Sequence, residues 1–225
     1  MDPSIQALRP ELEQAVHDLG LTLGEPQVTG LLRYLDLLKR WNAVYNLTAV
    51  REPDRMLRQH LVDCLAVVPA LRREQAGRPG GAGRRVLDVG SGGGLPGVVL
   101  ALVEPDLQVT CVDTVAKKAG FIRQVSAELG LPKLRAEHAR VEALDASQPY
   151  DFVTSRAFAS LRDFVTLTRH LLAPGGAWLA MKGAEPADEM SALPPDVDVF
   201  HVEQLSVPGL DARRCIVWMR TKDAV

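Results

Sequence analysis

The sequence is short of two features that would each indicate a particular class of protein. Its three cysteines, Cys64, Cys111 and Cys215, are scattered and show no Cys-x-x-Cys spacing, so neither a disulfide framework nor a zinc site is encoded. The longest apolar run, Val98 to Val103, is far too short to cross a bilayer, and the polar start is unlike a secretion signal. We therefore expect buried free thiols in a cytoplasmic protein without a membrane partner.

An excess of charge of one sign is also absent. The formal net charge of -2 over 225 residues gives no overall attraction to nucleic acid, although a local basic patch is compatible with such a balance. Apolar residues, in contrast, make up 47% of the chain, which is enough for a full-sized core. The composition predicts one domain with a small appendage.

The pattern of apolar residues changes once along the chain. Helical spacing runs from Gln27 to Tyr45, and a second helix is predicted from Arg55 to Leu71. Residues 72–85 are rich in glycine and arginine, which predicts a linker with solvated arginines. We therefore divide the chain into a helical N-terminal extension packed on the core (1–71), this linker, and a core domain (86–225).

Beyond the linker, short apolar strands alternate with helical stretches. Such alternation predicts right-handed crossovers and an α/β fold with a parallel sheet. Strands are predicted at 85–89, 108–113, 150–157, 177–182 and 215–220, helices over 115–129 and 161–172, and a turn at 173–176. The strand at 177–182 is counted as the sixth, and the last strand arrives after a long connection without a crossover helix.

A glycine-rich turn follows the first predicted strand, in the stretch LDVGSGGGLPG. Bare backbone lets a ligand approach closely at the carboxyl edge of a parallel sheet. Gly92 and Gly97 have the spacing of a phosphate loop, but two valines stand where that loop needs lysine and serine or threonine. The turn also fits a dinucleotide fingerprint, with Asp113 about twenty residues further on to hold a ribose. Tight helix packing is the purely structural alternative.

The same turn suits S-adenosylmethionine. Asp88, Gly90, Gly92 and Gly94 would then pass the cofactor, and Asp113 would accept hydrogen bonds from its two ribose hydroxyls. The turn LLAPGG and the late last strand favour this interpretation, because both are typical of the class I methyltransferase fold, whose seventh strand is antiparallel. An NAD-dependent oxidoreductase remains the alternative.

The loop after the strand at 150–157 bears on the methyl acceptor. It reads Ser155-Arg156-Ala157-Phe158 and lacks the Asp- or Asn-Pro-Pro-aromatic tetrapeptide of enzymes that methylate exocyclic amines. It also has no cysteine nearby to serve as a nucleophile. The remaining acceptors need neither base nor nucleophile, as is true of nitrogen 7 of guanine.

Five motifs together resemble one known family. They are LDVGSGGGLPG, WNAVYNLT at 41–48, HLVDCL at 60–65, SRAFASL at 155–161 and MKG at 181–183. This combination is similar to the RsmG (formerly GidB) family of small-subunit rRNA guanine-nitrogen-7 methyltransferases, and it covers nearly the whole chain. The resemblance implies a class I, Rossmann-like methyltransferase with a seven-stranded, mostly parallel sheet whose last strand is antiparallel, preceded by a helical extension.

The resemblance also implies a cofactor and a partner. These are S-adenosylmethionine as methyl donor and one guanine of 16S rRNA, in the 30S subunit or as free RNA, as acceptor. We expect a monomer without a metal. A non-catalytic ribosome assembly factor that binds RNA is a further alternative.

Several site residues are implied by their positions in the family's motifs. Gly90 and Leu95 would line the cofactor, the backbone around Val141 and Glu142 would border its adenine, and Arg156 would face the cofactor and the target base as the catalytic residue. The chain departs from the family at Cys64, where serine is usual, and in its longer linker.

Basic residues on several elements are predicted to converge at one edge of the sheet and bind RNA. They are Lys117, Lys118, Arg123, Arg140 and Lys182, together with Arg156. For any one of them except Arg156, an ordinary solvated charge is the alternative.

Four polar or aromatic residues of the N-terminal part carry separate expectations. His60 and Asp63, one helical turn apart, are too few for a metal site and are expected to form a hydrogen-bonded pair that ties the helical segment to the sheet. Trp41 is expected to pack in the core, and Asn42 and Asn46 share one helical face that would meet either backbone or RNA.

Overall fold

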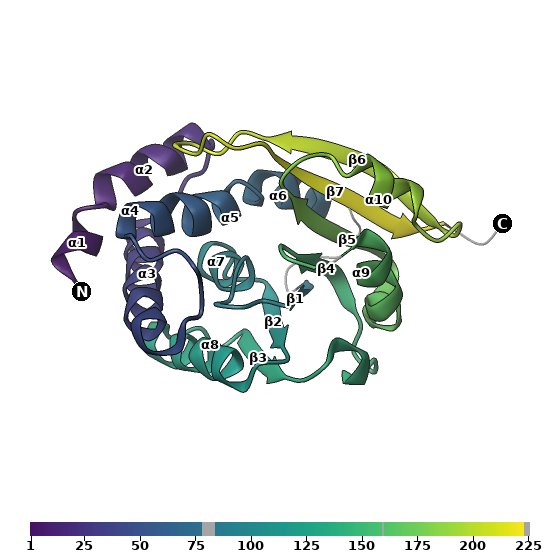
Figure 1. Ribbon diagram of the computed structural model, residues 1–225, viewed down its shortest axis with the longest axis horizontal. Coiled ribbons are helices and arrows are strands. Elements are labelled where there is room, and N and C mark those ends of the chain that lie inside the picture. The colour runs from purple at the N-terminus through teal and green to yellow at the C-terminus, as the bar shows by residue number, and fades with distance from the viewer. Residues whose placement is uncertain (78–83, 159, 223–225) are drawn as a thin grey trace.

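The central feature of the computed structural model, which describes residues 1–77, 84–158 and 160–222, is a seven-stranded sheet with helices on both faces (Figure 1). The strands are β1 Arg85–Val89, β2 Gln108–Asp113, β3 Leu134–His138, β4 Tyr150–Ser155, β5 Leu172–Lys182, β6 Val197–Leu205 and β7 Arg214–Thr221. Their spatial order is β3-β2-β1-β4-β5-β7-β6. Strands β1 to β5 pair in parallel, and β7 is antiparallel to both β5 and β6. The predicted mostly parallel sheet with an antiparallel last strand is confirmed.

Ten α-helices are found in the described ranges. They are α1 Pro3–Gln6, α2 Arg9–Asp18, α3 Glu25–Tyr45, α4 Pro53–Met56, α5 Asp63–Leu65, α6 Val68–Ala76, α7 Gly97–Val103, α8 Ala116–Leu129, α9 Leu161–Thr168 and α10 Ala187–Ser191. A π-helical segment, Leu57–Val62, joins α4 to α5, and short 3-10 turns occupy Val141–Ala143 and Arg169–Leu171. None of these helices is long and apolar enough to span a membrane.

Helix α3, which the apolar spacing predicted, is bounded by local signals at both ends. Pro26 lies in its first turn, where a missing N–H costs nothing, and the Gly24 N–H donates to Gln27 Oε1 at 2.8 Å. The helix ends at Asn46, which adopts the left-handed conformation (φ 50°, ψ 56°) that asparagine tolerates better than most residues. The end of α3 is thus fixed in place, and the chain turns toward the sheet edge.

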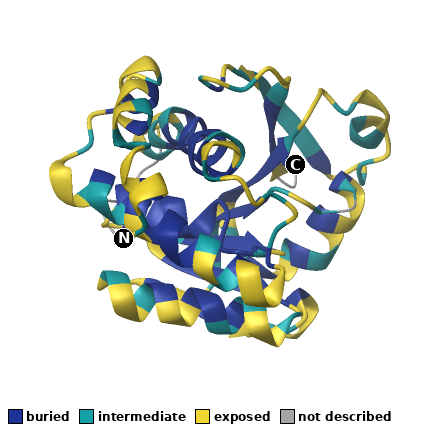
Figure 2. Cartoon of the chain, turned by 60° about the vertical axis from the view of Figure 1, so that its left-hand side comes forward, coloured by how far each residue is buried: buried dark blue, intermediate teal, exposed yellow. Residues whose placement is uncertain are grey.

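The two faces of the sheet are covered by different helices. Alternate residues of a strand point to opposite faces. In β1, Val86 packs with α3, α7 and α8, whereas Leu87 and Val89 pack on the side of α9. The N-terminal helices therefore share one continuous hydrophobic core with α7 and α8, and Figure 2 shows their buried sides turned inward.

The second predicted helix, over 55–71, is interrupted. Four short helical segments replace it, and α6 begins anew with Pro69 in its first turn, because proline has no N–H to continue the preceding hydrogen-bond ladder. Helix α6 continues to Ala76, so residues 72–76 of the predicted linker are helical, and Arg85 already belongs to β1. Residues 78–83 of that linker lie outside the described ranges.

Arginines at both ends of the predicted linker are paired and still partly solvated, since the Arg72 and Arg73 side chains are 40% and 61% exposed. Arg72 Nε lies 2.7 Å from Glu104 Oε1, and Arg73 forms an ion pair with Glu203. Arg85 Nη1 donates to the Gln148 carbonyl at 2.6 Å. These contacts hold both flanks of the segment against the core.

Two strands were missed by the sequence patterns. Both β3 and β6 lie at an edge of the sheet and alternate with polar residues, as edge strands commonly do. The strand at 177–182 is consequently the fifth and not the sixth. It also begins earlier, at Leu172, so the predicted turn at 173–176 is an irregularity within β5, where Gly175 has a φ of 70°.

Candidate active site

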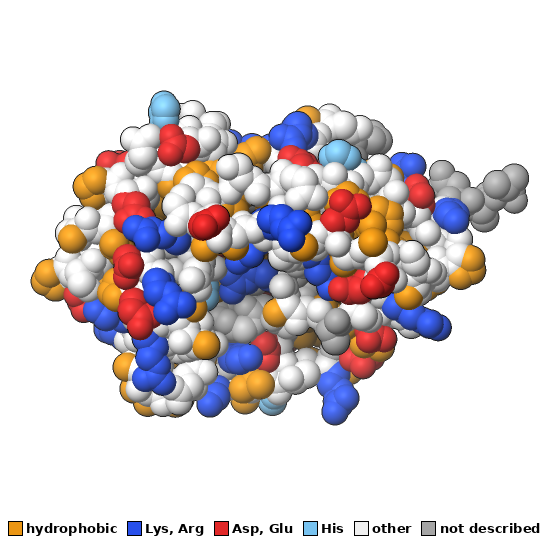
Figure 3. All heavy atoms as spheres, turned by 45° about the horizontal axis from the view of Figure 1, so that its top comes forward, with side chains coloured by type: hydrophobic (Ala, Val, Ile, Leu, Met, Phe, Trp, Pro, Cys, Tyr) orange, Lys and Arg blue, Asp and Glu red, His pale blue; other side chains and the backbone are white. Residues whose placement is uncertain are grey.

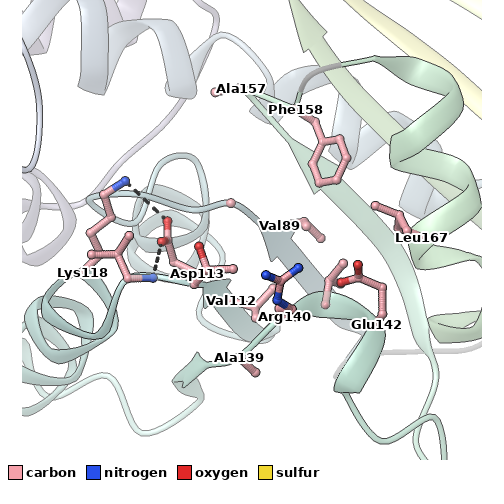
Figure 4. Close-up of a pocket in the computed structure, with 14 residues that line it drawn as sticks. Val89, Val112, Asp113, Lys118, Ala139, Arg140, Glu142, Ala157, Phe158 and Leu167 are labelled. Atoms are coloured by element: carbon pink, nitrogen blue, oxygen red, sulfur yellow. Dashed lines mark hydrogen bonds and ion pairs between the residues drawn. The ribbon is translucent and has the colours of Figure 1, made fainter.

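A cavity of about 470 Å³ opens where β1, β2, β3 and β4 end (Figure 4). Its lining comes from the ends of β1 and β2, from the segments that follow the four strands, and from α8 and α9. The lining residues are Val89, Gly90, Val112, Asp113, Thr114, Val115, Lys118, Ala139, Arg140, Val141, Glu142, Ala157, Phe158 and Leu167. The volume lies in the range of sites for small molecules and cofactors. We call it the first cavity.

The glycine turn brings backbone to the floor of the first cavity. Gly90, Gly92 and Gly94 have φ values of 67°, 57° and 90°, in the left-handed region that favours glycine. A Cβ at Gly90 would meet nothing within 4 Å, so this backbone faces open space. A Cβ at Gly94 would lie 2.4 Å from Val98 Cγ2, so this glycine permits close packing of α7. The turn therefore serves both ligand approach and helix packing.

Asp113 is fixed on one wall of the first cavity. Its Oδ2 accepts from the Gly92 N–H at 2.9 Å and lies 3.7 Å from Lys118 Nζ, while Oδ1 accepts from the Val115 N–H at 2.9 Å. Figure 4 shows Asp113 and Lys118 on one side of the cavity and Phe158 on the other. A carboxylate oxygen can accept more than one hydrogen bond, so Asp113 retains capacity for ligand hydroxyls.

Asp88 and Leu95, both predicted to bind the cofactor, lie behind the turn and outside the cavity lining. Asp88 is fully buried, and its Oδ2 accepts from the Gly97 N–H at 2.8 Å. Burial raises the pKa of Asp88 to about 7, against the opposing effect of the Gly97 N–H. Leu95 is buried in the core, and its N–H donates to the Ser91 carbonyl at 3.0 Å. Both residues shape the turn from behind.

Helix α3 also holds the glycine turn, which the sequence patterns did not predict. The hydroxyl of the fully buried Tyr34 donates to the Gly93 carbonyl at 2.7 Å. A Cβ at Gly93 would lie 3.0 Å from Leu38 Cδ1 of the same helix. The only sequence signal is a tyrosine, with a polar tip, on the apolar face of a helix.

A second cavity, of about 370 Å³, lies on the other side of the loop after β4. It is lined by Gln59, His60, Asp63, Arg156, Met181, Lys182, Gly183 and Arg214. Arg156 lines this second cavity, whereas the next residue, Ala157, lines the first. The two cavities are therefore neighbours that share one loop.

Asp63 organises the charges of the second cavity. Its buried carboxylate accepts from Arg214 Nε at 2.8 Å and lies 3.4 Å from Arg156 Nη1, which also donates to the Gln59 carbonyl at 2.9 Å. Lys182 is paired with Glu189 at 2.8 Å. Two arginines on one carboxylate leave the cavity with excess positive charge, and Figure 3 shows Lys and Arg side chains bordering the hollow in the middle of the face it displays.

The expected roles of His60 and Asp63 are met only in part. Asp63 does tie the helical segment to the sheet, but through Arg156 and Arg214. His60 Nε2 instead lies 2.8 Å from Thr48 Oγ1. Burial, and next the charge of Arg156, lower the pKa of His60 to about 4, so the ring is neutral at physiological pH.

The segment WNAVYNLT has a clear structural role. The buried Asn42 accepts from the Thr48 N–H at 2.8 Å through Oδ1 and donates to the Val50 carbonyl at 3.1 Å through Nδ2. Trp41 packs on Phe121, with ring centroids 5.4 Å apart, as expected. Asn42 therefore meets backbone, and the loop it closes carries Thr48 to His60.

A family model matches residues 27–217, and its description reads rRNA small subunit methyltransferase G, or GidB. The chain belongs to this family. Two curated relatives named Ribosomal RNA small subunit methyltransferase G agree with this assignment. The protein of Leptothrix cholodnii is 61% identical over 97% of this chain and 98% of its own, and that of Acidovorax ebreus is 59% identical over 95% and 96%. The predicted family resemblance is confirmed.

Solved structures support the fold. TrmN from Thermus thermophilus is 26% identical, with a TM-score of 0.52 over 70% of this chain and 48% of that one. The N-methyltransferase NodS from Bradyrhizobium japonicum, at 14% identity, matches with a TM-score of 0.53 over 69% of this chain and 94% of that one. The chain is therefore a methyltransferase of the GidB family, and neither the oxidoreductase nor the assembly-factor alternative gains support.

The methyl donor of this family is S-adenosylmethionine, and the first cavity fits it. Open space at Gly90 gives room for a ligand against bare backbone. Asp113 offers oxygens to ribose hydroxyls, and Val89, Phe158 and Leu167 form apolar walls for a flat ring. The described residues contain no group of three or more His, Cys, Asp or Glu side chains able to hold a metal ion.

The basic residues predicted to bind RNA are distributed over both cavities. Lys118 and Arg140 line the first cavity, and Lys182 and Arg156 line the second. Lys117 is exposed in the first turn of α8, beside Lys118.

Arg123 does not join these residues, which corrects its predicted place at the common edge. Its Nε donates to the Ala136 carbonyl in the middle of β3 at 3.0 Å, and it lines a separate groove with Leu134 to Glu137. Because α8 runs back along the sheet, a residue two turns into the helix is carried away from the edge.

Proposed function

We propose that the protein transfers the methyl group of S-adenosylmethionine to nitrogen 7 of a guanine in 16S rRNA. The observation that carries the proposal is the adjacency of the two cavities around Arg156 and Ala157. One cavity suits the cofactor, and the other presents positive charge to a polyanionic substrate. Relatives at about 60% identity are named as methyltransferases of small-subunit ribosomal RNA.

In the first cavity, chain groups bind and orient the cofactor. Gly90 backbone and the Asp113 carboxylate would hold its amino acid and ribose parts, and Val141 and Glu142 would border the adenine. When bound, S-adenosylmethionine supplies an electrophilic methyl group on a sulfonium. Gly92 and Gly94 keep the turn in shape by bonding Asp113 and by packing on α7.

In the second cavity, chain groups would position the guanine. Nitrogen 7 has a lone pair in the ring plane and carries no proton, so no general base is required. The contribution of the protein is then alignment and placement of charge, an effect worth up to ~7 to 11 kcal/mol in favourable systems. Arg156, oriented by Asp63 and the Gln59 carbonyl, is suited to hold the base and an adjacent phosphate at the boundary of the two cavities.

The remaining features of the proposal concern the working form of the enzyme. We propose a cytoplasmic monomer that needs no metal and takes its guanine from the 30S subunit or its rRNA. The N-terminal helices, which share a core with α7 and α8, would extend the RNA-binding surface beyond the cavities.

The decisive experiment is transfer of labelled methyl to 16S rRNA and to 30S subunits that lack the modification, followed by mapping of the modified atom. We expect one 7-methylguanosine, lost in Arg156→Ala and retained in Arg33→Ala, whose arginine lies in the middle of α3 and contacts the carboxyl-terminal end of α8. Label on another atom or base would contradict the acceptor. NADH binding in place of S-adenosylmethionine, or RNA binding without methyl transfer, would revive the two alternatives.

A further inference from the structure

Two adjacent side chains at the end of α3 are exposed although they are apolar. Val44 and Tyr45 are 69% and 41% exposed, and Met1 is the only other large hydrophobic residue exposed in the described part of the chain. Such residues are normally covered, and when they are clustered beside a functional site they mark a contact surface. The question is what covers this pair.

The pair lies beside the first cavity. Two contacts show that α3 runs antiparallel to α8. Arg33 donates to the Glu128 carbonyl near the carboxyl-terminal end of α8, and Trp41, later in α3, packs on Phe121, earlier in α8. Continuing this register brings Tyr45 to the first turn of α8, which carries Lys117 and Lys118. Lys118 in turn pairs with Asp113 on the wall of the first cavity.

The same pair is linked to the second cavity. Thr48 lies three residues after Tyr45, and its hydroxyl contacts His60, which lines the second cavity. The Tyr45 ring packs against Trp41, with ring centroids 5.0 Å apart, and this contact restricts its rotamers. Its position therefore suits a ligand that enters both cavities.

The surroundings of the pair are basic. Arg51 is exposed, and its guanidinium donates to the Asn46 amide oxygen at 2.9 Å, while no carboxylate among the described residues pairs with it. Lys117 is exposed as well, and it forms no ion pair with a residue in the described ranges. A supported aromatic ring with uncompensated cations around it is the chemistry that binds single-stranded nucleic acid.

We propose that Val44 and Tyr45 form a ledge on which an unpaired base of the rRNA substrate, next to the target guanine, stacks, while Arg51 and Lys117 hold its phosphates. This inference rests on the proposed function and adds a specific contact to it. The occupant is RNA and not a protein, because exposed cations without carboxylate partners complement a polyanion.

The test compares variants of Tyr45 in binding and methyl transfer, with bare 16S rRNA transcript as the probe. Tyr45→Ala is expected to raise the Kd and KM for this RNA about tenfold, since stacking of one base is worth roughly 1 to 3 kcal/mol. Tyr45→Phe should remain close to wild type and Tyr45→Leu should fall between them. The kcat and the Kd for S-adenosylmethionine should not change. A general loss of structure would alter both quantities.

Salt dependence separates the ledge from its cations. Tyr45→Ala should leave the slope of log Kd against log salt unchanged, whereas Lys117→Ala and Arg51→Ala should each reduce it by about 0.7, the value for one phosphate of a single strand. Arg33→Ala, which removes an exposed arginine of α3 about three helical turns before Tyr45, is the matched control and should leave the slope unchanged.

Each outcome decides the proposal. If the wild type methylates rRNA and Tyr45→Ala binds bare rRNA equally well, the ledge is wrong while the proposed function stands. If Tyr45→Ala loses affinity only for assembled 30S subunits, the ledge contacts a ribosomal protein and the proposal is overturned. If the wild type transfers no methyl either to bare 16S rRNA or to the rRNA of 30S subunits, it is the proposed function itself that fails.

Discussion

The two cavities are built in different ways. The first is made mainly of backbone and apolar walls, with Gly90 at its floor and Asp113 held by N–H groups of neighbouring loops. The second is made of charged side chains, in which Asp63 joins Arg156 and Arg214 from distant parts of the chain. A cofactor of fixed shape is thus met by a preformed backbone turn, and a polyanion is met by charges that the tertiary fold assembles.

The largest expected effect comes from breaking the charge cluster of the second cavity with Asp63→Ala. This change leaves the guanidinium groups of Arg156 and Arg214 half-buried without their counter charge. Removal of one partner from a buried ion pair costs about 3 to 5 kcal/mol. We expect the free energy of unfolding to fall by an amount near the lower end of this range. Urea denaturation measures it.

Activity and a control complete that prediction. Methyl transfer to rRNA should fall while the Kd for S-adenosylmethionine is unchanged, because the first cavity does not depend on Asp63. Asp196→Ala removes an exposed carboxylate that is paired with Arg169, so it should have a much smaller effect on stability. Equal losses in the two variants would contradict the distinction between the cavities.

Two buried titratable groups, His60 in the lining of the second cavity and Asp88 behind the glycine turn of the first, respond to pH in opposite directions. The pKa of His60 is lowered from 6.5 to about 4, so its contribution to stability is complete above pH 6.5 and is lost as the pH falls toward 4. The pKa of Asp88 is raised from 3.8 to about 7, so its contribution is present at low pH and is lost as the pH rises through 7.

The variant His60→Asn, whose side chain stays neutral, isolates the contribution of His60 to the pH dependence of stability. Between pH 7 and pH 4 the wild type should lose about 3 kcal/mol more of its free energy of unfolding than the variant does. Asp88 is present in both proteins and cancels in the difference. Parallel stability curves from urea denaturation at several pH values would show that His60 is not buried in neutral form.

A slightly smaller effect is expected from filling the first cavity with Gly90→Asp. The new side chain would occupy the open space beside the turn, and we expect an increase in the Kd for S-adenosylmethionine of about 100-fold, equivalent to ~2.7 kcal/mol. Calorimetry measures this, and the Kd for rRNA should not change.

Gly20→Asp is the matched control for that change. Gly20 has a φ of 65° and open space around it, as Gly90 does, but lies in the loop after α2. It reproduces the backbone strain without touching the cavity, so cofactor affinity should be kept. Loss of affinity in both variants would mean that strain, and not occupation of the cavity, is responsible.

The contrast between the cavities also explains what the sequence could predict. The bounds of β1 and β2 and the turn at Gly90 were predictable, because apolar runs and glycine spacing are local signals. Arg214 was not predicted, since it pairs with Asp63 across 151 positions of the chain and no periodicity records such a contact. The edge strands β3 and β6 were not predicted either, because polar residues interrupt the apolar runs from which the other strands were predicted.

The smallest effect is expected at the connection between the octapeptide and the second cavity, in Thr48→Val. Valine keeps the shape of threonine but loses the contact to His60 Nε2, so the free energy of unfolding should fall by about 1 kcal/mol. Thr48→Ser, which retains the hydroxyl, should lose less. If methylation of rRNA weakens in Thr48→Val and not in Thr48→Ser, the hydroxyl acts by orienting His60 in the second cavity. Weakening in Thr48→Ser and not in Thr48→Val would instead assign the role to packing of the threonine methyl group, which valine keeps. Cofactor affinity should be the same in all three proteins, because this hydrogen bond belongs to the cavity built from side chains and not to the one built from backbone.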